Sequence, residues 1–76
     1  MSKNCLGPKV AKLRKNAGLS YKELADRFQK IGIDLSETDL QRIESGDRVI
    51  FDFEIIGFTI LFNCSPSDMF SDLDIN

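Results

Sequence analysis

The sequence predicts a small all-α fold, and three observations favour this fold class. The chain has 76 residues, enough for one domain only. Apolar residues recur at helical spacing between serines and glycines that suit the beginnings and ends of helices. The segment around residues 50–62 would also suit a buried strand, but a lone strand in a helical chain of this size would have no partner. We therefore expect a helix there as well.

The first two helices are predicted from their end signals. Gly7 and Pro8 can open the first helix, and Gly18 can end it in the left-handed conformation. Ser20, followed three residues later by Glu23, is a capping box for the second helix. The expected inward faces are Val10, Leu13 and Ala17 on the first helix, and Leu24, Phe28 and Ile31 on the second, which runs up to Gly32.

Three further helices follow the same logic. Ser36 and Asp39 open a helix over 37–45 that ends at Gly46, with Leu40 and Ile43 inward. Asp52 is the expected cap of the fourth helix, and Ser65 is that of a short last helix. The fourth helix should share one face among Ile55, Phe58, Thr59 and Phe62, and the last helix, with Pro66 and Asp68 in its first turn, should turn Met69 and Phe70 inward. We predict an N-terminal tail over 1–5, a domain over 6–70 and a frayed acidic tail over 71–76.

Composition excludes several classes of function. The chain has no histidine, and Cys5 and Cys64 lack metal-ligand spacing, so we expect no metal, no cofactor and no enzymatic activity. We interpret both cysteines as reduced thiols of a cytoplasmic protein, with a disulfide between them as the less favoured alternative. The longest apolar run is far shorter than the roughly 20 residues needed to cross a bilayer. No membrane association is therefore expected.

Charge is divided unevenly along the chain, although the net charge is only −2. Residues 1–30 carry eight Lys and Arg against two acids, whereas residues 31–76 carry two Arg against ten acids. Such a dipole could direct a polyanion toward the N-terminal half, and two solvated faces of opposite sign are an equally good explanation.

Two motifs carry a specific resemblance. The segments "LSYKELADRF" and "LSETDLQRIESGDR" resemble the Cro/repressor-type helix-turn-helix of the XRE family, with matches at Leu19, Ser20, Leu24, Ala25, Ser36, Leu40, Ile43, Glu44 and Gly46. The resemblance covers roughly residues 6–70 and implies a five-helix, lambda-repressor-like DNA-binding domain. The resemblance implies a sequence-specific, repressor-like transcriptional regulator that reads the major groove with helix 37–45.

The resemblance also implies roles for individual residues. Base contacts would come from Glu37, Thr38 and Gln41. Phosphate contacts would come from Ser20, Tyr21, Lys22, Ser36, Arg42 and Arg48, although Tyr21 stands where the family usually has glutamine. Arg14 and Glu44 match a structural ion pair between the first and third helices.

Helix 37–45 is unusually acidic for a DNA-reading helix. Glu44 is explained by the ion pair, and Asp39 by helix capping. Glu37 could favour the helix dipole, or it could accept a hydrogen bond from cytosine. Asp47 lies where the family often has a basic residue, so we expect modest affinity of one copy for double-stranded DNA.

A second class of function stays open. Phe51, Phe53, Ile56 and Ile60 cannot all be buried with the opposite face of their helix, so several should form an exposed apolar patch. We interpret this patch as a homodimer interface. The alternative is that the fold serves as a protein-interaction module, such as an antitoxin or adaptor, that binds a protein partner and retains only weak DNA binding.

Overall fold

The structure is a computed structural model that describes residues 2–71, and within that range it contains five helices and no strand. They are α1 (Gly7–Asn16), α2 (Tyr21–Lys30), α3 (Glu37–Ser45), α4 (Asp52–Leu61) and α5 (Pro66–Met69). The all-α prediction is confirmed, including the choice of helix over strand for α4. The predicted frayed end lies mostly outside the described residues. None of these helices combines the length and the apolar composition that a membrane span requires.

Three of the five helices begin with the serine cap that the sequence predicts. The Oγ atoms of Ser20, Ser36 and Ser65 accept hydrogen bonds from the amides three residues later, at 3.1, 3.0 and 3.1 Å. In each case the acid at that third position accepts a bond from the serine amide, at 3.0 Å. These reciprocal bonds satisfy amides that no helical carbonyl can reach, so the sequence itself sets where α2, α3 and α5 start.

The start of α4 differs from the prediction. Phe51, and not Asp52, is the residue before the first helical turn, and Asp52 is the first helical residue. Glu54 supplies the capping contact, because its Oε1 accepts from the Phe51 amide at 3.0 Å. A phenylalanine side chain has no acceptor to return that bond, so α4 has half of a capping box.

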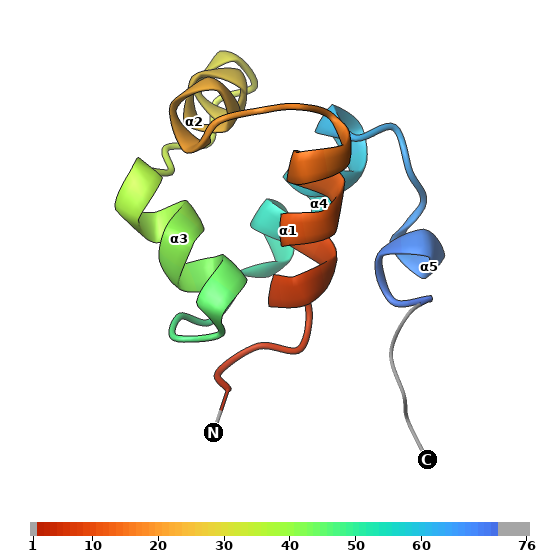
Figure 1. Ribbon diagram of the computed structural model, residues 1–76. Coiled ribbons are helices and arrows are strands. Elements are labelled where there is room, and N and C mark those ends of the chain that lie inside the picture. The colour runs from red at the N-terminus through yellow and green to blue at the C-terminus, as the bar shows by residue number, and fades with distance from the viewer. Residues whose placement is uncertain (1, 72–76) are drawn as a thin grey trace.

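The core lies where α1, α2, α3 and α4 meet (Figure 1). At its centre Phe28 and Phe58 are fully buried and meet edge to face, with ring centroids 4.7 Å apart. The other buried apolar residues are Leu6, Val10, Leu19, Leu24, Leu35, Leu40, Ile43 and Met69. Three predicted core residues were wrong: Ala17, Ile31 and Phe70 are exposed. Each stands at or beyond the end of its helix, where the chain turns away from the apolar face.

Helices α1 and α3 approach each other closely at Gly7. A Cβ atom placed on Gly7 would lie 2.5 Å from the Ile43 carbonyl oxygen and 2.6 Å from that of Glu44. Both are backbone atoms that a rotamer change cannot move away. Glycine is thus the residue that lets the start of α1 rest on the end of α3.

Asn4 fastens the same two helix ends. Its Oδ1 accepts from the amides of Leu6 and Gly7, at 2.9 and 2.7 Å, while its Nδ2 donates to the carbonyls of Ile43 and Arg48, at 3.1 and 2.7 Å. The Lys3 amide donates to the Gly46 carbonyl at 2.7 Å. Residues 3 and 4 are therefore part of the packed structure at the end of α3.

Candidate nucleic-acid interface

The outer face of α3 presents the three side chains expected to read bases. Glu37, Thr38 and Gln41 are exposed, and none of them has a hydrogen bond or ion pair within the described part of the chain. Gln41 follows Thr38 by three residues and Glu37 by four. These spacings place all three side chains on one side of the helix. The face thus offers a carboxylate, a hydroxyl and an amide to a ligand.

The buried face of the same helix explains why Glu37, Thr38 and Gln41 face outward. Leu40 and Ile43 are fully buried, and Gly46 adopts a left-handed conformation with φ of 82° that ends the helix. A left-handed residue lets the last amides return to carbonyls of the final turn, here those of Arg42 and Ile43. Both ends and the rotation of α3 about its axis are therefore fixed.

Glu44 lies at the centre of a partly buried polar cluster behind that face. Arg14 donates to it through Nε at 2.6 Å and through Nη2 at 3.2 Å, and the two side chains are only 12% and 8% exposed. This is the ion pair that the resemblance implies. Arg14 Nη1 also donates to the Leu19 carbonyl at 2.9 Å, so the pair joins α1, α3 and the segment between α1 and α2.

Tyr21 belongs to this cluster as well. Its hydroxyl donates to Glu44 Oε1 at 2.9 Å, and the Arg14 guanidinium lies over its ring, 4.1 Å from the centroid. The hydrogen bond to Glu44 raises the pKa of Tyr21 above its ordinary value. The hydroxyl that was expected to donate to a phosphate thus donates to a carboxylate of its own chain.

Arg48, a second expected phosphate contact, is also engaged. Its Nη1 and Nη2 donate to the two carboxylate oxygens of Glu54, at 2.8 and 2.9 Å. Its Nε lies 3.6 Å from Asp39 Oδ1. The bonds to Glu54 raise the pKa of the guanidinium, which is 18% exposed. Arg48 therefore connects the first turn of α3 to the first turn of α4.

Lys22 and Arg42 remain at the surface with exposed partners. Lys22 Nζ lies 3.3 Å from Asp26, and Arg42 Nε lies 3.3 Å from Asp47. These pairs are half-exposed or more, so water and salt weaken them and a phosphate can compete for each cation. The hydroxyls of Ser20 and Ser36 accept from amides but keep their own hydrogen for donation.

The acids of α3 and of the turn that follows it divide into engaged and free groups. Glu44 holds Arg14, Asp47 faces Arg42, and Asp39 caps the helix. The hydrogen bond from the Ser36 amide is the main reason why the pKa of Asp39 lies below its ordinary value. Of these four acids, only Glu37 has no side-chain partner among the described residues.

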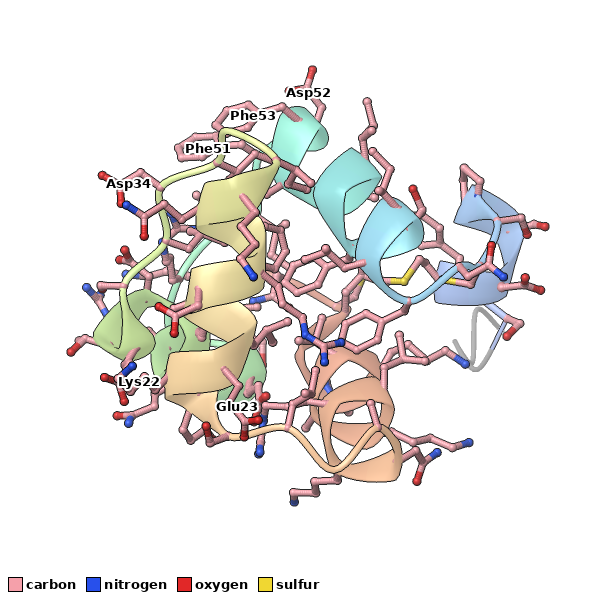
Figure 2. All side chains as sticks on the ribbon, turned by 90° about the horizontal axis from the view of Figure 1, so that it is seen from above. Lys22, Glu23, Asp34, Phe51, Asp52 and Phe53 are labelled. Carbon is pink, nitrogen blue, oxygen red and sulfur yellow. The ribbon has the colours of Figure 1, made fainter. Side chains whose placement is uncertain are left out.

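An apolar patch lies at the start and along the outer side of α4. It consists of Phe51, Phe53, Ile56 and Ile60, which are 50, 52, 57 and 60% exposed. The rings of Phe51 and Phe53 stack at 5.8 Å with an interplanar angle of 7°. Figure 2 shows both rings projecting at the edge of the molecule beside Asp52, at the opposite end of α2 from Lys22 and Glu23.

Sequence reasoning missed two residues of this region, one of which organises it. Glu54 is 2% exposed and holds Arg48, and its position three residues after the helix start was the available signal. Val49, two residues before Phe51, is a further large apolar residue with an exposed side chain, at 46%. A scan of protein-family models found none that matches the chain, and a search of curated proteins found no significant match.

Proposed function

We propose that this protein is a sequence-specific DNA-binding regulator of the repressor type. In this proposal α2 and α3 form the helix-turn-helix of a lambda-repressor-like domain, and α3 enters the major groove. The supporting observation is the contrast on α3. Glu37, Thr38 and Gln41 are exposed and unengaged within residues 2–71, whereas Glu44 is held by Arg14 behind that face.

The chemistry of the free side chains supports base reading. The amide of Gln41 can pair with the two major-groove groups of adenine, and the hydroxyl of Thr38 can donate or accept. The carboxylate of Glu37 accepts only, which suits the amino group of cytosine and opposes guanine. Discrimination would thus come from hydrogen bonds.

Phosphate contacts should contribute less than is usual for DNA-binding proteins. Lys22 and Arg42 are the cations of the site that a phosphate can reach, because their partners are exposed, while Arg48 and Tyr21 are engaged inside the fold. Two contacts predict a slope of log affinity against log salt of about −1.8 for each subunit. We expect weak binding by one copy, and a smaller loss of affinity with rising salt than for a protein that makes five phosphate contacts.

A homodimer would supply the missing affinity. The apolar patch of Phe51, Phe53, Ile56 and Ile60 is the proposed contact between copies, since its four side chains remain at least half exposed. Two α3 helices about 34 Å apart would reach successive major grooves of a palindromic site. Joining two weak contacts in one molecule raises affinity without adding any new contact.

Selection from a random duplex library tests this function. The protein is mixed with the library at about 50 mM and about 200 mM salt, and the retained DNA is sequenced. We expect an enriched palindrome, and Gln41→Ala should lose discrimination at one base pair by about 1 to 3 kcal/mol. Gln29→Ala is the matched control, because Gln29 is an exposed glutamine on α2. Retained DNA without any enriched sequence would contradict base reading by α3.

A protein-interaction module is the second candidate, and the apolar patch favours it. Exposed phenylalanines and isoleucines at an edge of a small domain are typical of protein contacts. If the library yields no retention at either salt concentration, this candidate replaces the first. Phe53→Asp should then abolish capture of a protein partner. The exposed Lys22→Asp, at the opposite end of α2 from the two phenylalanines of the patch, is the control.

A further inference from the structure

We propose that Arg48 determines base selectivity without contacting DNA, by holding Asp39 and with it the first turn of α3. This inference rests on the proposed function, since selectivity has meaning only for a DNA reader. Arg48 would be a positioning residue between Glu54 of α4 and Asp39 of α3. The role differs from the phosphate contact that the sequence resemblance implies for it.

The guanidinium of Arg48 is anchored by Glu54 of α4. Arg48 and Glu54 form a two-point contact at 2.8 and 2.9 Å, and their side chains are 18% and 3% exposed. Arg48 Nη1 also donates to the Val49 carbonyl at 2.8 Å. A planar guanidinium bound at two points to a carboxylate has a fixed orientation. Arg48 is therefore held from the α4 side.

The guanidinium of Arg48 also faces Asp39 of α3. The two carboxylate oxygens of Asp39 have different partners. Oδ2 accepts a hydrogen bond from the Ser36 amide at 3.0 Å, and Oδ1 lies 3.6 Å from Arg48 Nε. The Asp39 amide in turn donates to Ser36 Oγ at 3.0 Å. Arg48 thus orients the side chain that closes the capping box, from which the first turn of α3 begins.

The first turn of α3 also carries two of the three residues proposed to read bases. Glu37 and Thr38 are the two residues between Ser36 and Asp39, so they lie inside the capping box that Asp39 closes. Productive recognition requires contacting groups to be held within about 0.5 Å by the residues around them. Loosening Asp39 would let Thr38 and Glu37 shift against the base edges, and discrimination at those base pairs would fall.

The same contacts argue against a phosphate role for Arg48. To reach DNA the guanidinium would have to leave Glu54, whose carboxylate would stay buried without its cation. An unpaired buried charge is strongly unfavourable. The two roles also predict opposite effects of Glu54→Gln. Releasing a phosphate-binding arginine would strengthen binding and steepen its salt dependence, whereas releasing a positioning arginine would reduce discrimination.

The experiment compares Arg48→Gln, Arg48→Lys and Glu54→Gln with the wild type, at a temperature where circular dichroism shows every variant folded. Affinity is measured for the selected palindrome and for a site changed at the base pair read by Thr38. We expect all three variants to lose discrimination about fivefold. Lysine should not rescue the function, because an ammonium group cannot make the two-point contact with Glu54. The salt slope should stay that of the wild type.

Two results would overturn the inference. One is a salt slope about 0.9 smaller in Arg48→Gln with discrimination unchanged, which is the signature of a lost phosphate contact. The other is stronger DNA binding by Glu54→Gln. A general loss of stability would lower the melting temperature but would not alter discrimination between two sites by the folded protein.

Amide hydrogen exchange provides a measurement that does not require DNA. Exchange at Asp39 and Leu40 should be faster in Arg48→Lys and Glu54→Gln than in Asp26→Asn, which removes an exposed pair on α2. If the wild type binds no DNA, the proposed function fails and selectivity fails with it, while faster exchange would still establish the hold of Arg48 on α3. If the wild type binds its site and exchange at Asp39 is unchanged, only the role of Arg48 is refuted.

Discussion

Gly7→Ala is expected to destabilise the protein, although glycine-to-alanine changes in helices usually stabilise. Alanine gains up to about 1 kcal/mol over glycine in a helix interior. The added Cβ, however, would lie 2.5 Å and 2.6 Å from two backbone oxygens of α3. An ordinary carbon–oxygen contact is about 3.3 Å or longer, so α1 would have to retreat by about 0.8 Å.

The magnitude follows from these two opposing effects. Overpacking of a well-packed contact costs about 1 to 3 kcal/mol, and rigid backbone atoms place Gly7 at the upper end. With the helix preference subtracted, we expect a net loss of about 2 kcal/mol in the free energy of unfolding. In a domain of this size that loss corresponds to a melting temperature lower by about 8 to 16 °C.

Urea unfolding followed by far-UV circular dichroism measures the change. Gly18→Ala is the matched control: Gly18 has φ of 69° and nothing within 4 Å of an added Cβ, so only backbone strain of about 1 kcal/mol is expected. A Gly7→Ala protein as stable as the wild type, or more stable, would refute the close packing of α1 on α3.

Three further predictions concern the ion pair, the caps and the apolar patch. Glu44→Gln should lower the free energy of unfolding by about 3 kcal/mol in urea titrations, because Arg14 loses its partner in a poorly exposed site. The pKa of Asp39 lies below its ordinary value of 3.8, mainly through the Ser36 amide, so its stabilising effect is complete above about pH 4 and is lost as pH falls through the lowered pKa. Asp39→Asn should accordingly flatten the acid limb of a stability profile, and an unchanged limb would count against the cap. Phe53→Asp should yield monomers in sedimentation equilibrium experiments if the patch joins two copies, whereas unchanged mass would remove the patch from the interface.

The helices were predictable because their signals are local. A serine followed three residues later by an acid satisfies the first amides of a helix within a single turn, and the three such pairs that lie within residues 2–71 behave as predicted. Glycines with positive φ at 18, 32 and 46 mark ends that a side chain would strain. Such contacts depend on residues only a few positions apart, so the sequence displays them directly.

The engagement of side chains around the site could not be predicted, because it depends on residues distant in the chain. Arg14 and Tyr21 reach Glu44 from 30 and 23 positions away. Arg48 and Tyr21 have the chemistry of phosphate contacts, and only the packing of α1, α3 and α4 places carboxylates against them. The pattern was also wrong at helix ends. Ile31 and Phe70 continue the apolar faces of their helices, but the helices end before them and their side chains stay exposed.

The side chain of Asn4 has a consequence for the order in which contacts form during folding. Its carbonyl partners Ile43 and Arg48 follow 39 and 44 positions later in the chain. The first amides of α1 can be capped early by Oδ1, but the end of α3 has to wait for the same side chain. Binding of Asn4 to the end of α3 therefore requires two distant segments of the chain to meet, so we expect this contact to form later in folding than the local caps of the helices.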